Sequence, residues 1–157
     1  MLAYYFNNYY NYNYNQMRAL YKILILVVFA GGCSTRTQVK VTNLKCENKV
    51  NPLGIDVEKP RFSWISESDQ HGVSQSAYQI MVASSWKNLE ENSADVWESP
   101  KVSSDKSIQI GYEGKPLESN RKYFWKVKIW DQAGQPHSSE PAFWSSGLLH
   151  GSDWTKP

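Results

Sequence analysis

The clearest alternation of apolar and polar side chains in this sequence lies between Tyr123 and Asp131. Every second position there carries a residue suited to a buried face: Tyr123, Trp125, Val127 and Ile129. Successive side chains of a β-strand point to opposite faces, so this period of two predicts a half-buried strand. Aromatic and β-branched residues also favour the extended conformation. We expect the other strands to pack around this one.

A tyrosine corner is expected at the start of that strand. In immunoglobulin-like sandwiches a tyrosine near the start of the sixth strand hydrogen-bonds back to backbone a few residues upstream. Tyr123 is the candidate for this role, with Leu117 six residues ahead of it. We assign Trp125, and Trp64 from another expected strand, to the core.

Shorter alternating segments along the chain predict further strands. They cover residues 39–47, 60–66, 75–84, 96–99, 107–112 and 142–149, with turn or loop sequences between them. Residues 86–93 fit either a helical turn or a loop. About seven short strands without a long helix predict an all-β fold, most simply an antiparallel two-sheet sandwich. The inter-sheet cysteine pair of antibody domains is missing, so we expect the fibronectin type III variety of the immunoglobulin-like fold. An eight-stranded jelly roll is the main alternative.

The first of these segments is expected to be an edge strand. Its alternation sets one group of residues (Val41, Asn43 and Lys45) against another (Thr42, Leu44 and Cys46).

Residues 1–32 indicate targeting rather than folding. Residues 1–16 are a low-complexity leader of Asn and Tyr, a composition that builds no specific core. Translation from Met17 would leave this leader outside the protein. Residues 17–32 have the order of a signal peptide, with a basic start, an apolar run over 23–30 and small residues at the end. That run is too short to span a ~30 Å hydrocarbon layer as a helix.

Cys33 directly after two glycines resembles a bacterial lipoprotein signal. The resemblance implies that Cys33 becomes the lipid-modified first residue, with residues 33–38 as a tether. The product would be an exported lipoprotein, anchored to a membrane in the periplasm or at the cell surface. The alternative is an ordinary secretory signal, with Cys33 free or removed. Once Cys33 is lipid-modified, Cys46 lacks a disulfide partner, and we expect it to be a buried strand residue.

Charge and motif content exclude several classes of function. Residues 1–32 carry two basic side chains and no acid, which leaves 15 basic and 15 acidic side chains in the rest. A neutral domain lacks the electrostatic footprint of a nucleic-acid-binding protein. The three histidines are isolated and no glycine-rich phosphate loop occurs, so we expect no metal and no cofactor. The acids fit turns and solvated faces, and we assign no catalytic residue.

Five tryptophans lie outside the clearest inward positions: Trp86, Trp97, Trp130, Trp144 and Trp154. Exposed rings on a β-sandwich can stack on sugar faces. An aromatic patch is equally typical of a protein interface. We therefore treat these five as candidate contacts with a sugar or with a neighbouring domain. Packing of the rings under loops or against that domain is the simpler explanation.

Several segments carry a family resemblance through their order and spacing. They are Asn51–Asp56, Pro60–Trp64, Gln75–Ile80, Asp95–Ser99, Lys101–Asp105, Tyr123–Val127 with Trp130 and Asp131, and Asp153 with Trp154. Together they resemble the N-terminal β-sandwich module of bacterial α-L-rhamnosidases, which remove terminal L-rhamnose from glycosides and polysaccharides. The resemblance implies a sandwich over residues 39–150, with residues 151–157 starting a linker to a downstream domain that this chain lacks.

In that family, hydrolysis is carried out by carboxylates on a separate (α/α)₆-barrel domain, through an inverting mechanism. The resemblance therefore implies a truncated, non-catalytic chain that is inactive alone. Its partners would be the downstream catalytic domains of the same polypeptide, and the membrane through the lipid anchor. The alternative is a free-standing surface sandwich that binds carbohydrate, such as rhamnose-containing glycans, or proteins through exposed aromatics.

Overall fold

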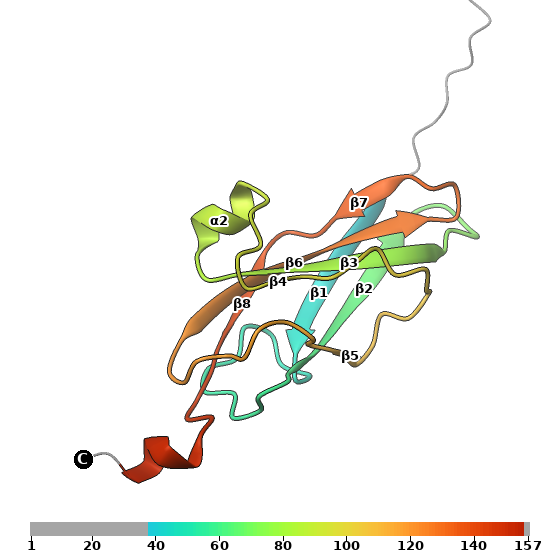
Figure 1. The fold of residues 1–157 in the computed structure, drawn as a ribbon. Helices are drawn as coiled ribbons and strands as arrows, with labels where there is room; N and C mark the ends of the chain where they lie inside the picture. The colour runs from blue at the N-terminus through green and yellow to red at the C-terminus, as the bar shows by residue number, and fades with distance from the viewer. Residues whose placement is uncertain (1–37, 156–157) are drawn as a thin grey trace, which may run out of the picture. The chain divides into compact units, whose positions relative to one another are not determined.

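Two antiparallel sheets form two layers in the computed structural model, which describes residues 38–155 (Figure 1). The first sheet has the order β1-β2-β5, with β1 (Val39–Cys46), β2 (Arg61–Ser68) and β5 (Ile110–Gly111). The second has the order β4-β3-β6-β7, with β4 (Trp97–Glu98), β3 (Gln75–Ala83), β6 (Lys122–Asp131) and β7 (Pro136–Ser138). The last strand, β8 (Ala142–Ser145), also pairs with β6. The predicted all-β, two-sheet sandwich is confirmed.

Seven of the eight strands within residues 38–155 correspond to segments that the sequence predicted. The exception is β7, a three-residue strand that begins with Pro136 and pairs with β6. Such a short segment has no period to read, and proline is unfavourable in a strand unless it lies at the strand start or edge. The fold therefore contains one strand more than the expected seven.

Strand β6 occupies the centre of the second sheet. Its inward positions Tyr123, Trp125, Val127 and Ile129 are buried and its outward positions are half-buried, as the alternation predicted. It pairs with β3 on one side and with β7 and β8 on the other. Every other strand of this sheet except β4 therefore pairs directly with β6.

A β-bulge corrects the predicted faces of β1. The register with β2 shifts between Thr42 and Lys45, and Asn43 adopts a left-handed φ of 51°. The extra residue changes the alternation, so Val41 and Leu44 both face the core instead of opposite sides. Asparagine is among the few residues that tolerate this conformation. The position of β1 at the edge of its sheet was predicted correctly.

The segment 107–112 is mostly loop. Only Ile110 and Gly111 form the strand β5, because Gln109 has a left-handed φ of 57° that breaks the extended backbone. Ile108 is consequently turned outward and 70% exposed.

A short helix covers the outer face of β3. The helix α2 (Trp86–Glu90) begins at Ser85, whose hydroxyl accepts a 3.1 Å hydrogen bond from the Asn88 N–H. Ser at this position satisfies one of the free N–H groups of the first turn. Leu89 packs with Met81 and Ala83 into a second, smaller apolar cluster. This cover explains why β3 is buried on both faces.

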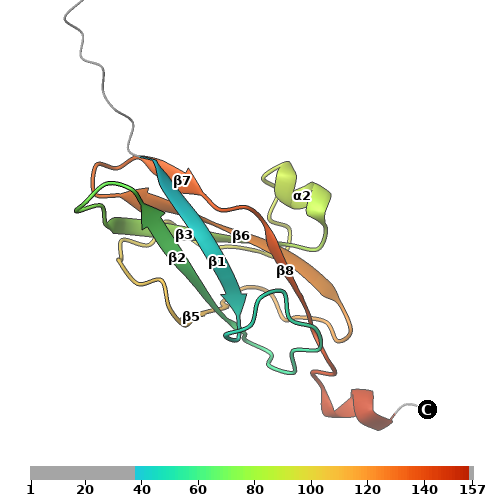
Figure 2. The ribbon, with the colours of Figure 1, turned by 180° about the vertical axis from the view of Figure 1, so that it is seen from behind.

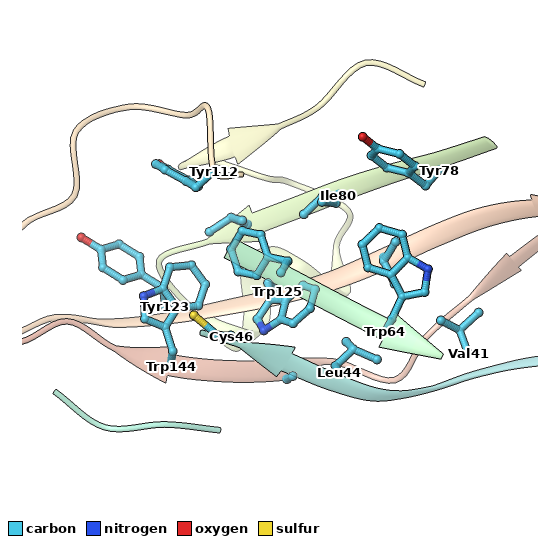
Figure 3. Close-up of a cluster of buried hydrophobic side chains, with 14 of the residues drawn as sticks. Val41, Leu44, Cys46, Trp64, Tyr78, Ile80, Tyr112, Tyr123, Trp125 and Trp144 are labelled. Atoms are coloured by element: carbon cyan, nitrogen blue, oxygen red, sulfur yellow. The ribbon is translucent and has the colours of Figure 1, made fainter. Parts of the chain in front are cut away.

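The main core lies between the sheets and is rich in aromatic residues (Figure 3). The ring of Phe62 lies 4.4 Å from that of Trp125 and 5.4 Å from that of Trp144. Cys46 is a free cysteine in this core, and burial raises the pKa of its thiol to about 12. The thiolate is the nucleophilic form of cysteine, so Cys46 is a packing residue, as predicted.

The predictions for residues 1–37, including the leader, the signal peptide and Cys33, lie outside the described residues. Within residues 38–155, no helix has the length and apolar character that crossing a membrane requires.

Candidate functional site

The five candidate tryptophans lie on five different elements, and within residues 38–155 no ring contact joins two of them. Trp86 is on α2, Trp97 on β4, Trp130 on β6, Trp144 on β8, and Trp154 on the 3₁₀ helix η1 (Gly151–Thr155). They therefore do not form one continuous aromatic platform.

Trp144 corrects the sequence prediction, because its side chain is fully buried. Pairing of β8 with β6 places Trp144 opposite Tyr123, and the two rings stack with centroids 5.1 Å apart. The indole Nε1 is buried without a hydrogen-bond partner, so the residue contributes through ring packing. Phe143 and Trp144 are adjacent aromatics, and only the pairing with β6 decides which of them faces the core.

Trp97 and Trp130 are half-buried and engaged by neighbours. The Trp97 ring packs against Phe62 and Tyr112, with centroid distances of 6.4 Å and 5.1 Å. Two ammonium groups lie over the Trp130 ring, that of Lys101 at 4.2 Å and that of Lys128 at 5.2 Å from its centroid. Such cation–π pairs occupy the aromatic surface that a sugar would need.

Trp86 and Trp154 are the two most exposed tryptophans of residues 38–155, at 43% and 71%. Trp86 is still held in place: its Nε1 donates a 2.6 Å hydrogen bond to Glu90, and its ring meets Phe124 edge-on at 6.0 Å. Trp154 projects from η1, where the sequence predicted the start of a linker.

A groove of about 710 Å³ runs beside β4 and β5. Its lining combines the rings of Tyr78 and Trp97 with the carboxylates of Asp105 and Glu113. Burial, and to a smaller degree the charge of Glu113, raises the pKa of Tyr78. Its neutral hydroxyl can donate or accept a hydrogen bond. Rings combined with polar groups are able to bind a polar ligand. This groove is the candidate ligand-binding surface of the domain.

Three carboxylates outside the groove are held as structural anions. Burial opposes the ionisation of Asp131, but hydrogen bonds from His137 and from two backbone N–H groups outweigh it and lower its pKa. The same balance lowers the pKa of Asp95, through bonds from Ser84. The pKa of Glu47 is lowered chiefly by its hydrogen bonds from Arg61. A general acid for glycoside cleavage needs a raised pKa, so these groups suit structure and not proton donation.

No three His, Cys, Asp or Glu side chains within residues 38–155 are grouped in a way that could hold a metal ion. His137 lies 3.1 Å from Asp131, and His150 lies 3.9 Å from Glu58.

Tyr123 links the start of β6 to the preceding loop. Its hydroxyl oxygen accepts a 2.8 Å hydrogen bond from the backbone N–H of Glu118, five residues upstream. Trp125 and Trp64, the other two residues assigned to the core, are 1% and 2% exposed. These three residues therefore have a structural role in the core of the sandwich.

We expect Tyr123→Phe to lower the free energy of unfolding by about 1–2 kcal/mol, because the Glu118 N–H loses its acceptor while the ring packing remains. Urea denaturation of residues 38–157 measures this. Tyr78→Phe is the matched control, since it removes a hydroxyl at the open groove, where water can replace it. Equal losses in the two variants would contradict a specific role for the Tyr123 bond.

Comparison with known proteins identifies the family. A family model described as "Rha78A-like, N-terminal immunoglobulin domain" matches residues 41–150, the greater part of the chain. The chain belongs to this family. The match confirms both the immunoglobulin-like sandwich and the resemblance to the N-terminal module of α-L-rhamnosidases.

Relatives of this immunoglobulin domain are much longer than the chain. An α-L-rhamnosidase of Formosa agariphila is 43% identical over 146 residues, which cover 90% of this chain and 15% of the relative. The crystal structure of Streptomyces avermitilis α-L-rhamnosidase complexed with L-rhamnose has a TM-score of 0.70 at 42% identity, covering 75% of this chain and 11% of that one. The α-L-rhamnosidase from Dictyoglumus thermophilum gives the same TM-score at 39% identity, over 74% of this chain and 13% of that one. The chain thus spans less than a sixth of the length of these relatives.

Proposed function

We propose that residues 39–150 are the non-catalytic N-terminal module of an exported α-L-rhamnosidase, a glycoside hydrolase acting on terminal L-rhamnose. The observation that carries this proposal is the match of residues 41–150 to the N-terminal immunoglobulin domain of that family. The chain spans 15% of the Formosa agariphila relative and 11% of the Streptomyces avermitilis one, so the match concerns one part of those enzymes.

The module would have a structural role in the enzyme. It packs against the domains that follow it, and lipid-modified Cys33 anchors the assembly to a membrane facing the periplasm or the cell exterior. The lowered pKa values of Asp131, Asp95 and Glu47 support a structural role, because these acids stay ionised instead of donating protons.

Two assays test this function. Purified residues 39–157 should not hydrolyse an aryl α-L-rhamnoside, because the lowered pKa values of Glu47, Asp95 and Asp131 make these acids unsuited to donate a proton to the leaving group. Turnover that is lost on replacing one of this domain's own carboxylates would refute it. In the second assay, a Streptomyces avermitilis enzyme whose matching region is deleted should lose heat stability, and insertion of residues 38–157 at that place should restore it. A chimera no more stable than the deletion would also refute the module function.

The groove gives support to a second candidate, a surface sandwich that binds carbohydrate. Trp97 and Tyr78 line it together with the carboxylates of Asp105 and Glu113. Titration calorimetry with rhamnose-containing oligosaccharides, comparing the wild type with Tyr78→Ala, distinguishes this function from a purely structural role. Binding that Tyr78→Ala weakens would support the sugar-binding function.

A further inference from the structure

Four exposed apolar side chains are carried by the segments at the end of the domain where the chain leaves the sandwich. The loop between β1 and β2 lies beside the segment after β8, because Ile55 bridges Ser146 and its carbonyl accepts a 2.7 Å bond from Gly147 (Figures 1 and 2). This end of the domain carries Leu53, Val57, Leu148 and Trp154, which are 74%, 40%, 38% and 71% exposed. We call these four residues the exit patch.

The helix η1, which carries Trp154, is fixed to the domain by hydrogen bonds. The carboxylate of Asp153 accepts from the Ser119 hydroxyl and, at 3.1 Å, from the backbone N–H of His150. Ser119 in turn accepts a 2.9 Å bond from the Leu149 N–H. The Asp153 N–H donates back to the His150 carbonyl at 2.9 Å. This clamp joins the last turn of the chain to the loop that precedes β6.

The clamp does not serve to bury η1, because none of the residues of η1 is buried. Ordering a residue costs roughly 1–2 kcal/mol of backbone conformational entropy. Here the hydrogen bonds, and not the burial of apolar side chains, mainly offset that cost. They hold the backbone of η1 against the loop before β6, and the 71% exposed side chain of Trp154 projects from this helix.

We propose that the exit patch is the docking surface for the domain that follows this one in the same polypeptide, with Trp154 as the anchor. The proposal rests on the proposed function. The relatives, of which this chain spans 11–15%, hold most of their length outside the matched region. A domain joined directly behind η1 meets the patch at a high effective concentration. Tryptophan in a fixed position is a typical energetic centre of an interface.

The partner surface should be apolar and hollowed to accept an indole. Glu58 and His150, 3.9 Å apart, lie beside the patch and provide a polar rim. An apolar centre with a polar rim is the usual composition of such contacts. A second sandwich, or any other domain with an apolar pocket near its own N-terminus, satisfies this requirement.

A chimera tests the docking surface. Residues 38–157 replace the matching region of the Streptomyces avermitilis α-L-rhamnosidase, as the unchanged sequence, as Trp154→Ala, or as the control Trp86→Ala. Trp86 is also an exposed tryptophan but lies on α2. We expect protease cleavage at the junction behind residue 157 to be about 30-fold faster in Trp154→Ala, the effect of losing a central interface tryptophan. The Trp86→Ala chimera should be cleaved like the unchanged one.

The outcomes distinguish the two proposals. If the unchanged chimera is protected and heat-stable and Trp154→Ala is equally protected, the domain docks through another surface, and only this inference fails. If the unchanged chimera is neither protected nor more stable than the deleted enzyme, the module function itself fails. The isolated Trp154→Ala domain should unfold at the same urea concentration as the wild type, which excludes misfolding as the cause of cleavage.

A second measurement does not require the chimera to fold. The isolated domain, labelled with 5-fluorotryptophan, is mixed with the enzyme that lacks the matching region. Fluorine NMR resolves the seven tryptophans, and single Trp→Phe variants assign the Trp154 and Trp86 signals. A shift or broadening of the Trp154 signal alone supports docking through the exit patch. A response of Trp86, or no response at saturating enzyme, contradicts it.

Discussion

Replacement of Trp125 by alanine should leave the domain unfolded or barely folded. Trp125 is 1% exposed, its ring lies 4.4 Å from that of Phe62, and it stands opposite Val82 in the pairing of β6 with β3. It therefore joins the two sheets at the middle of the core. Truncating a buried tryptophan to alanine costs about 3–5 kcal/mol. Small domains have a total stability of about 5–15 kcal/mol, so the loss removes a large part of it.

Urea denaturation of residues 38–157, followed by far-ultraviolet circular dichroism and by fluorescence, measures this loss. Trp154→Ala is the matched control, because the same truncation at a 71% exposed side chain removes little packing. We expect it to change the free energy of unfolding by less than about 0.5 kcal/mol. A Trp125→Ala domain as stable as the Trp154→Ala domain would mean that the contact between the sheets is not the source of stability.

The core could be predicted well from the sequence where the two faces of a strand differ in chemistry. In β6 the inward positions are aromatic or branched and the outward positions include three lysines, so the alternation identifies the buried face directly. In β1 the same reasoning failed, since the bulge at Asn43 depends on the register with β2. A period of two holds only while the ladder is regular. One inserted residue reverses it without any change in composition.

The candidate site was harder to predict, because exposure of an aromatic ring is a tertiary property. Trp144 and Trp154 both lie outside the clearest alternating segments of the sequence, yet one is fully buried and the other is 71% exposed. The difference arises from the pairing of β8 with β6 and from the clamp on η1. Lys128 lies two residues before Trp130 on the same face of β6, as the spacing indicates, but the contact of Lys101, from the loop after β4, cannot be read from spacing.

Asp131 shows the same limit for a polar residue. The sequence assigned the acids to turns and solvated faces, and a turn does follow Asp131: Gly134 has a φ of 77°, and its N–H donates to the Asp131 carbonyl. Asp131 is, however, buried and not solvated, with only 2% of the residue exposed. Its Oδ1 accepts bonds of 2.9 Å and 2.8 Å from the N–H groups of Ala133 and Gln135. The carboxylate therefore organises the hairpin between β6 and β7.

We expect Asp131→Ala to lower the free energy of unfolding by about 2–4 kcal/mol, since it leaves these turn N–H groups and His137 without their acceptor. Asp131→Asn keeps the shape and the acceptor oxygen, and it should lose about half as much. Urea denaturation at pH 7 compares the variants. Glu98→Ala, which removes an exposed carboxylate bonded to Gln79, is the control and should cost less than about 1 kcal/mol.

The charge of Asp131 adds a pH dependence whose sign follows from its lowered pKa. In the unfolded chain an aspartate titrates near ~3.9. A group with a lower pKa in the folded state stabilises the fold fully above that value, and this stabilisation is lost as the pH falls through the folded pKa. The difference in unfolding free energy between wild type and Asp131→Asn should thus be constant from about pH 7 to 5 and shrink below about pH 4. If the difference persists unchanged at pH 3 while the wild type remains folded, the shape of the side chain, and not its charge, holds the hairpin.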